Sequence, residues 1–198
     1  MKLIIATHNQ DKLAEVRNIL DVGDVKIISA DDAGILEDIE EDGATLEENA
    51  LKKARYVWNK THEWTLADDT GVFIDALGGR PGIYAARWAG ENATGADVLS
   101  HTLHELDGIP HERRTAEFVS VIALISPEGQ ELIFCGTVRG IFLVAPRGEH
   151  PEQLPYDSLF VPDGETETFA EMPREKKNAM SHRARALAQV KDFFSAYS

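Results

Sequence analysis

The order of apolar runs along this chain limits its fold more than any other feature. A strand-length apolar run at residues 3–6 is followed by a helical pattern at 11–20 and by a second strand-length run at 25–29. Two long β-rich runs, 116–125 and 131–144, come later and have a turn sequence between them. Early alternation of strands and helices followed by a β-rich middle predicts an α/β protein with a mixed central sheet.

Helix start signals agree with this pattern. Thr45, with Glu48 three residues later, forms a capping box before an apolar stripe at helical spacing, so a helix is predicted from this point. Thr94 and Asp97 give a similar signal for a helix that ends near residue 106. Pro173 is expected to be the first helical residue of a terminal helix.

Length and charge narrow the organisation of the chain and its class of partner. With 198 residues and 43% hydrophobic content, it is expected to form one domain, or one domain folded into two lobes. The net charge of -14 disfavours a nucleic-acid partner and requires a local basic cluster wherever a polyanion binds. No apolar segment approaches membrane-spanning length, which predicts a protein that is neither exported nor membrane-inserted.

The chain has a single cysteine, Cys135, which excludes an intramolecular disulfide and a thiolate metal cluster. Its apolar neighbours Ile133 and Phe134 predict an inert, buried thiol. These features favour the reducing cytoplasm.

The first candidate site is the loop Thr7-His8-Asn9-Gln10-Asp11-Lys12, between the first strand and the first helix. A loop that leaves a buried strand and opens a helix presents free backbone N–H groups to an anion. Lys12 adds a positive charge, and Thr7 and Asn9 add hydrogen-bond donors. The loop lacks the glycines and the Gly-Lys-Ser/Thr ending of a P-loop, and simple helix capping by Asp11 is the alternative interpretation.

A pair of carboxylates forms the second candidate site. Asp68 and Asp69 follow the strand-length run 64–67 and precede Thr70 and Gly71. Magnesium prefers oxygen ligands and retains waters, so adjacent carboxylates at a strand end suit a hard cation. One of them could also orient or deprotonate an attacking water. The motif alone fits a solvated turn about equally well, because Asp and Gly are common in turns.

Glu41 and Lys53 form the third candidate site. Glu41 lies in the acidic stretch 31–42, which is expected to be irregular, and Lys53 follows Asn49 by four residues on the capped helix. Lys52 and Lys53 point about 100° apart on a helix, so one can face a cleft while the other is solvated. Taken separately, each residue also fits an ordinary surface charge.

A dense group of cations and hydrogen-bond donors at residues 175–183 is the fourth candidate. His182 and Arg183 could recognise a phosphate or the carbonyl edge of a base, since Arg has a planar fork of donors. The alternative is surface charge on the first turns of the terminal helix.

Together these motifs resemble those of the inosine/xanthosine triphosphate pyrophosphatase family across essentially the whole chain. Six spaced motifs agree in order, which makes the resemblance specific. The matching motifs are Thr7-x-Asn9-x-x-Lys12, Asn49-Ala50-x-x-Lys53-Ala54, Ala67-Asp68-Asp69-Thr70-Gly71, Gly79-x-Pro81-Gly82-x-Tyr84-x-Ala86-Arg87, Thr168-Phe169-Ala170-Glu171-Met172 and Lys177-Asn178-Ala179-x-Ser181-His182-Arg183.

The resemblance implies a two-lobed α/β fold around a central cleft, a homodimer, and hydrolysis of inosine or xanthosine triphosphates and their deoxy forms to monophosphate and pyrophosphate. It implies Mg²⁺ as cofactor, with Mn²⁺ as the alternative. Asp69 would be the general base and, with Glu41, a metal ligand, and Lys53 would be the other catalytic residue. The implied substrate-binding residues are Thr7, His8, Asn9, Lys12, Thr70, Leu154, Tyr156, Asp157, Lys177, His182 and Arg183.

The chain departs from the family pattern in two places. His8 stands where the family usually has Gly, which could narrow the approach of phosphate to the loop. The family pattern Gly-Phe-Gly-Tyr-Asp-Pro is replaced here by the sequence of residues 153–158, in which Leu154 offers apolar contact but no aromatic face for a purine. Pro155 also removes a backbone N–H. We therefore expect weakened or shifted base selectivity, with Tyr156 or Trp88 as a substitute stacking platform.

Two alternative functions remain at this point. The altered loop keeps open a related pyrophosphatase with a preference for pyrimidine or modified nucleotides, in the manner of the septum-associated Maf group. A module that senses a nucleoside triphosphate without hydrolysing it is the other alternative. The sensor is disfavoured because Glu41, Lys53 and Asp69 are all present, whereas a sensor has no need of a metal-bound water.

Overall fold

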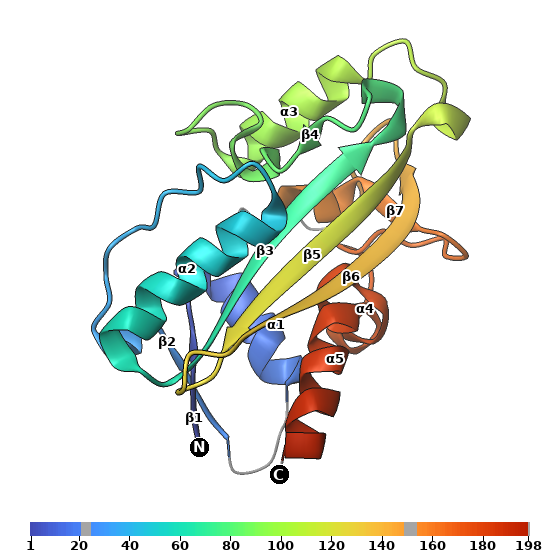
Figure 1. Ribbon diagram of the computed structural model, residues 1–198. Coiled ribbons are helices and arrows are strands. Elements are labelled where there is room, and N and C mark those ends of the chain that lie inside the picture. The colour runs from blue at the N-terminus through green and yellow to red at the C-terminus, as the bar shows by residue number, and fades with distance from the viewer. Residues whose placement is uncertain (21–24, 149–153, 198) are drawn as a thin grey trace. The chain divides into compact units, whose positions relative to one another are not determined.

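The computed structural model describes residues 1–20, 25–148 and 154–197 (Figure 1). The strands are β1 (Lys2–Ile5), β2 (Lys26–Ser29), β3 (Trp64–Ile74), β4 (Pro81–Gly82), β5 (Thr115–Ile125), β6 (Glu131–Phe142) and β7 (Phe160–Pro162). The α-helices are α1 (Gln10–Ile19), α2 (Leu46–Thr61), α3 (Gly95–Glu105), α4 (Arg174–Met180) and α5 (His182–Tyr197).

The strands form one mixed sheet in the order β2-β1-β3-β5-β6-β7, with β4 paired to β3. β1 is parallel to both β2 and β3, whereas β4 is antiparallel to β3 and β7 is antiparallel to β6. A strand with parallel neighbours on both sides is normally covered on both faces, which explains why β1 is a continuous apolar run. The predicted α/β class with a mixed sheet is confirmed.

The described chain divides into two compact units. The first comprises residues 1–69, 120–136 and 182–198, and the second comprises residues 70–119 and 137–181. β3, β5 and β6 each contribute residues to both units. The expected single two-lobed domain and its central cleft stay predictions.

The core of the first unit joins α1 and α5 to the strands. Leu13, Val16 and Leu20 recur at helical spacing along and just beyond α1 and are buried, as their spacing predicts. They share a cluster with Leu187 and Val190 of α5. Each fully buried side chain of this size contributes roughly 1.5–3 kcal/mol. This packing fixes α1 directly after β1, so the loop between them has a defined position.

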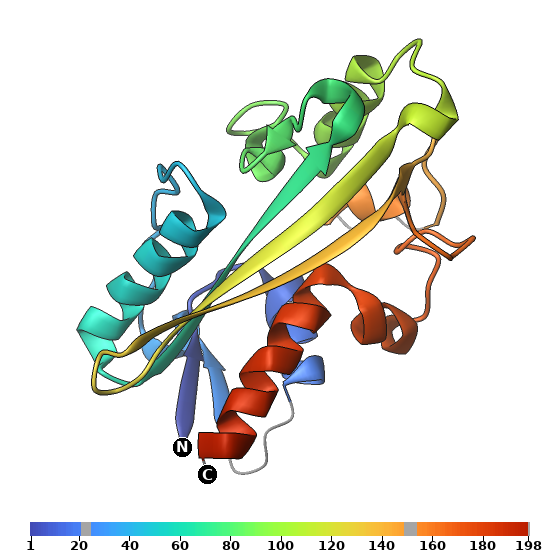
Figure 2. The same ribbon diagram turned by 45° about the vertical axis from the view of Figure 1, so that its right-hand side comes forward.

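Helix α2 covers the opposite side of the first unit's strands from α5 (Figures 1 and 2). Thr45 is the N-cap as predicted, and its hydroxyl oxygen accepts a hydrogen bond from the Glu48 N–H. The reciprocal bond of the predicted capping box is shifted by one residue, because the Glu48 carboxylate accepts from the Ala44 N–H at 2.6 Å. Its buried positions include the apolar Ala50, Ala54 and Val57, but also Lys53. A buried lysine in this stripe needs anionic partners, and these lie on β3 and on the segment before α2.

The second unit has an aromatic core. Phe118 lies edge-on to Phe160 with ring centroids 4.4 Å apart, and Phe142 and Tyr156 belong to the same cluster. Edge-to-face pairs of this kind stabilise a core beyond the area they bury. Helix α3 packs here through Val98 and begins at the predicted Thr94–Asp97 capping box, which is complete.

Three local predictions were wrong. Asp68 to Gly71 do not end a strand, because β3 continues through them to Ile74. The terminal helix is two helices, since Ser181 adopts an extended backbone between α4 and α5. Pro173 is the N-cap of α4 and not its first helical residue. Apolar periodicity continues through such a break and therefore does not reveal it.

Cys135 is exposed, which contradicts the expected buried thiol. It lies on β6 in a run where exposed positions alternate with less exposed ones, so Cys135 faces solvent while Phe134 packs against the core of the first unit. Side chains of neighbouring strand residues point to opposite faces, and apolar neighbours are therefore poor evidence of burial.

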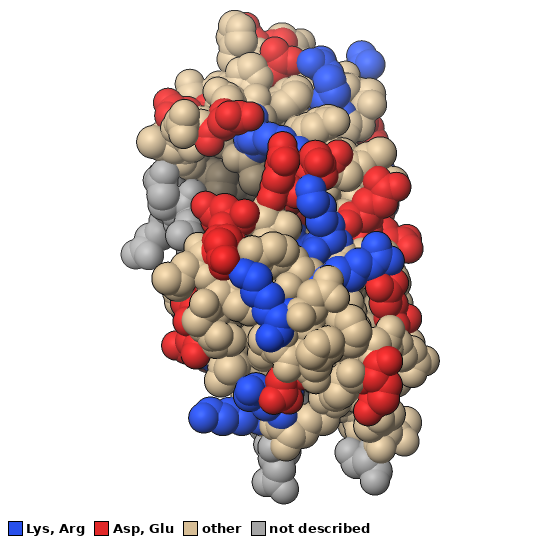
Figure 3. All heavy atoms as spheres, turned by 60° about the vertical axis from the view of Figure 1, so that its left-hand side comes forward, with Lys and Arg blue, Asp and Glu red and all other residues tan. Residues whose placement is uncertain are grey.

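On the face shown in Figure 3, acidic and basic side chains are interspersed, as expected for a solvated surface. Within the described residues, no helix combines the length and the apolar character that crossing a membrane requires.

The start of α5 rests directly on β6 at Gly136. A Cβ added at this glycine would lie 2.1 Å from the His182 carbonyl oxygen and 2.6 Å from the Ala186 nitrogen, both of them backbone atoms. Only a residue without a Cβ allows this approach, so Gly136 sets the position from which His182 and Arg183 project.

We predict that Gly136→Ala lowers the free energy of unfolding by about 2 kcal/mol or more, because overpacking against backbone cannot be relieved by a rotamer change. Urea unfolding followed by tryptophan fluorescence measures this loss. The adjacent exposed substitution Cys135→Ala is the control and should change stability by less than about 0.5 kcal/mol. Equal urea midpoints for the two variants would contradict the packing argument.

Candidate active site

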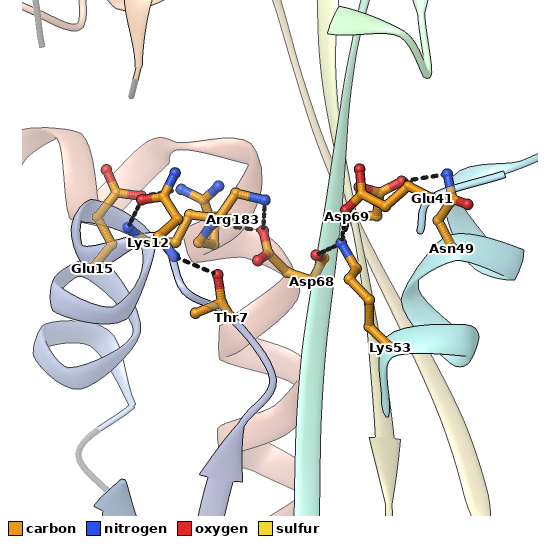
Figure 4. Close-up of polar contacts among 10 residues, drawn as sticks. Thr7, Lys12, Glu15, Glu41, Asn49, Lys53, Asp68, Asp69 and Arg183 are labelled. Carbon is orange, nitrogen blue, oxygen red and sulfur yellow. Dashed lines mark hydrogen bonds and ion pairs between the residues drawn. The ribbon is translucent and has the colours of Figure 1, made fainter. Parts of the chain in front are cut away.

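Two consecutive carboxylates of β3 form the centre of the candidate site. Asp68 and Asp69 are 3% and 5% exposed. As neighbours in a strand they point to opposite faces of the sheet, Asp68 toward α1 and α5 and Asp69 toward α2 (Figure 4). Each face must therefore supply its own cations, because a buried carboxylate without a partner is strongly destabilising.

On one face, Asp68 is held by two cations. Its Oδ2 accepts a hydrogen bond from Arg183 Nε at 3.0 Å and lies 3.3 Å from Lys12 Nζ. Burial alone would raise the pKa of Asp68, but Lys12 and Arg183 hold that pKa far below its ordinary value. The Arg183 guanidinium also donates to Glu15 of α1. Asp68 is therefore a permanent anion that anchors two of the predicted phosphate-binding cations.

The loop before α1 places Lys12. Thr7 Oγ1 accepts a hydrogen bond from the Asn9 N–H at 3.1 Å, and Asn9 Oδ1 accepts one from the Lys12 N–H at 2.9 Å. Asn9 is thus the N-cap of α1. Burial lowers the pKa of Lys12, and the cations Lys53 and Arg183 lower it further, against the opposing effect of Asp68.

On the other face, a single ammonium group joins two carboxylates. Lys53 Nζ donates to Glu41 Oε1 at 2.5 Å and to Asp69 Oδ1 at 3.2 Å. It also donates to the backbone carbonyl of Asp68 at 2.7 Å. Burial would lower the pKa of Lys53, but Asp69 and Glu41 outweigh that effect and raise it. Lys53 is therefore charged and held at three points.

Asn49 fixes the second oxygen of Asp69. It is fully buried, donates from Nδ2 to Asp69 Oδ2 at 3.2 Å and accepts at Oδ1 from the Gly43 N–H at 2.8 Å. A Cβ at Gly43 would lie only 2.7 Å from this oxygen, so the approach needs glycine. Burial raises the pKa of Asp69, Lys53 acts against this, and Glu41 raises it again. Asp69 is thus a stronger base than an ordinary aspartate.

The chemistry of this face fits a hard divalent cation. Glu41 and Asp69 converge on one ammonium group, which shows that their oxygens can share a cation. Mg²⁺ commonly takes one or two carboxylates and keeps several waters. Among residues 1–20, 25–148 and 154–197 there is no group of three or more His, Cys, Asp or Glu side chains arranged to hold a metal. The pair Glu41 and Asp69 fits an ion that takes two protein carboxylates.

The remaining predicted residues of the first unit are His8 and His182. His8 lies in the loop before α1 and is paired with Asp31, with 2.7 Å between Nδ1 and Oδ1. His182 is the first residue of α5 and is 4% exposed. Burial at this position distinguishes His182 from the surface charge that was the alternative interpretation.

Other predicted residues belong to the second unit. Lys177 Nζ donates to Asp157 Oδ2 at 2.6 Å, and both side chains are buried. Tyr156 is 6% exposed and donates its hydroxyl hydrogen to the Ala85 carbonyl oxygen, so little of its ring is available to stack on a base.

Thr70, Leu154 and Trp88 are half-buried. The rings of Trp88 and His101 pack edge to face, with 5.0 Å between their centroids. Thr70 follows Asp69 in β3 and begins the second unit, and Gln153 of the altered loop lies outside the described residues.

Comparison with known proteins identifies the family of the chain. The model of the Ham1 family matches residues 3–193. This chain belongs to the Ham1 family. A dITP/XTP pyrophosphatase of Geobacter sulfurreducens is 46% identical over 191 residues, which cover 96% of this chain and 95% of that protein. The family resemblance inferred from the six motifs is confirmed.

Solved structures of Ham1 proteins have the same fold. The Ham1 protein of Staphylococcus aureus superimposes with a TM-score of 0.87 at 32% identity and covers 100% of both chains. The crystal structure of the nucleoside-triphosphatase, dITP/XTP pyrophosphatase, of Mycobacterium abscessus gives a TM-score of 0.75 at 41% identity, covering 96% of this chain and 98% of that one.

Sequence reasoning missed two roles in this Ham1-family site. Glu15 was not singled out, although it lies three residues after Lys12 and so shares a helix face with it. Asp68 was noted, but its role as the buried partner of Lys12 and Arg183 was not foreseen. Arg183 lies 115 residues away in sequence, and no local pattern links such a pair.

We predict that Asp68→Asn destabilises the protein by about 3–5 kcal/mol at neutral pH, because it removes the buried carboxylate that contacts the cations Lys12 and Arg183. Chemical denaturation of both proteins measures the difference. Asp75→Asn is the matched control. Asp75 pairs with Arg139 at 2.8 Å while both side chains are about half exposed, so its loss should cost less than about 1 kcal/mol. Similar losses for the two substitutions would show that Asp68 does not anchor the cluster.

Proposed function

We propose that this Ham1-family chain is a dITP/XTP pyrophosphatase, which hydrolyses non-standard purine nucleoside triphosphates to the monophosphate and pyrophosphate. Two relatives that are 46% identical over 96% and 98% of this chain carry that name. The observation that carries the proposal is the arrangement around β3, where Lys12 and Arg183 flank Asp68 while Lys53 joins Asp69 to Glu41.

The loop before α1 is suited to hold the triphosphate. Helix N-termini attract phosphate, and Lys12 stands in the first turn of α1 beside the Asn9 cap. The cations at this site must overcome a net charge of -14 on the whole chain, and the buried cluster concentrates them. These cations contact carboxylates of the protein, and a bound phosphate would add a further anionic partner.

Asp69 is proposed as the general base. It takes a proton from a water molecule whose oxygen bonds to the α-phosphorus, while the bond from that phosphorus to the bridging oxygen breaks and pyrophosphate leaves. Burial raises the pKa of Asp69, which improves proton acceptance at neutral pH. Asn49 and Lys53 bind separate oxygens of the carboxylate and hold its orientation.

Glu41 and Asp69 are the proposed ligands of Mg²⁺, with Mn²⁺ as the alternative ion. When bound, such an ion supplies positive charge that offsets the phosphate oxygens during hydrolysis. Lys53 is proposed to stabilise the charge that develops on the phosphates, because its ammonium group is fixed beside Asp69 before substrate arrives.

The other expectations of the resemblance stay predictions. They include substrate contacts by Thr70, Asp157, Lys177 and His182, the homodimer and the cytoplasmic location.

The first test is pyrophosphate release from a panel of nucleoside triphosphates. We expect release from dITP and XTP with Mg²⁺ and its loss on chelation. Asp69→Asn should lower kcat about 10²- to 10⁴-fold, the usual contribution of a general base. Asp75→Asn, an exposed aspartate outside the cluster, is the matched control and should leave kcat unchanged.

Other outcomes of this panel would redirect the proposal. Faster release from a pyrimidine or modified triphosphate than from dITP or XTP would favour a shifted base preference. Binding of triphosphates without any pyrophosphate release would favour a nucleotide sensor.

The altered loop gives a second test. We predict that Leu154→Phe raises kcat/KM for dITP and XTP about two- to tenfold, because an aromatic ring can stack on a purine where leucine cannot. Steady-state kinetics with these substrates and with dATP measures the change. A Leu154→Met variant, which changes shape without adding a ring, should leave kcat/KM near the wild-type value. Equal gains for Phe and Met would exclude stacking as the cause.

A further inference from the structure

His8 connects the loop before α1 to the acidic segment that leads into α2. Its Nδ1 lies 2.7 Å from Asp31 Oδ1, and its Nε2 lies 3.3 Å from the backbone carbonyl oxygen of Glu37. Asp31 and Glu37 are six positions apart, so one side chain contacts both the beginning and the middle of the segment.

The segment has little regular structure to hold it in place. After the short 3-10 helix Asp31–Ala33, no helix or strand occurs in the described chain until α2 begins at Leu46. Lysines of α2 bind its side chains, with Lys60 Nζ 2.7 Å from Glu37 and Lys53 Nζ 2.5 Å from Glu41. These ties fix the segment to α2, whereas His8 ties it to the loop that carries Lys12.

The partners of His8 determine its charge state. A carboxylate oxygen and a carbonyl oxygen are both acceptors, so the ring must donate from both nitrogens and be an imidazolium to make both bonds. The charged groups that face it are Asp31 and Asp38, because the Glu37 carboxylate is engaged with Lys60. Burial lowers the pKa of His8, but the bonds to Asp31 and to the Glu37 carbonyl outweigh this effect and raise it.

We propose that His8 is a positioning residue which, as an imidazolium, fastens the Asp31–Glu41 segment to the phosphate-binding loop and so sets the place of Glu41. His8 acts through the segment and need not touch the reacting atoms. The link is complete below the pKa of His8 and loses one hydrogen bond above it, so Glu41 becomes less well placed as the pH rises. The consequence for metal binding rests on the proposed function.

Hydrogen–deuterium exchange of the metal-free protein tests the link directly. In His8→Ala, the amides of residues 34–42 should exchange about two- to fivefold faster than in the wild type, the scale of a partly exposed ion pair. Amide exchange rates also depend on pH through their intrinsic chemistry, so each rate is divided by its intrinsic value. In the wild type, the corrected rates of residues 34–42 should rise as the pH passes the pKa of His8. In His8→Ala, they should not change with pH in this way. His104→Ala, at an exposed position on α3, is the control. Unchanged exchange in His8→Ala would overturn the proposal.

Dependence on Mg²⁺ tests the consequence for Glu41. The Mg²⁺ concentration for half-maximal pyrophosphate release should rise about two- to fivefold in Asp31→Asn, which removes the charge that His8 binds, with kcat at saturating Mg²⁺ little changed. A lower kcat with the same Mg²⁺ dependence would contradict a positioning role. If the wild type hydrolyses no triphosphate, the proposed function fails while the exchange experiment still decides whether His8 holds the segment.

Discussion

Two adjacent carboxylates buried in one strand impose the constraint on which the rest of the site depends. Asp68 and Asp69 face opposite sides of β3, so each carboxylate needs a cation in contact with it on its own side. Placing ionised carboxylates in a protein interior costs several kcal/mol each unless well-oriented partners offset it. Helices on both faces therefore have to present cations, which α1 and α5 do on one side and α2 on the other.

The cations on both faces of β3 also suit the site to a polyanion. The cations that offset Asp68 and Asp69 are fixed by packed helices before any substrate arrives, and fixed charges need little reorganisation when charge develops during hydrolysis. The same ion pairs weaken phosphate binding, because phosphate oxygens must compete with the carboxylates that already contact these cations. A divalent ion held by Glu41 and Asp69, as proposed, would reduce that competition by neutralising these two carboxylates.

Local signals in the sequence predicted much of the fold. The stripe Leu13, Val16 and Leu20 and the caps at Thr45 and Thr94 depend on neighbours within a few residues, and these features were confirmed. The family was recognised from six spaced motifs and is confirmed by comparison with known proteins.

The errors arose where distant residues decide the outcome. Composition left a solvated turn as an equal alternative at Asp68, because Asp and Gly are typical of turns, but Arg183 and Lys12 allow this carboxylate to remain inside a strand. Glu15 was overlooked for the same reason, since its partner Arg183 is 168 residues away. Contacts at such separations leave no periodic trace in a single sequence.

The exposure of Cys135 gives the chain a natural attachment point. It is the single cysteine of the sequence, and it immediately precedes Gly136, on which the start of α5 rests. A maleimide dye would therefore react at one defined position without any engineered cysteine. Its emission would report on the surroundings of β6 beside the helix that carries Arg183.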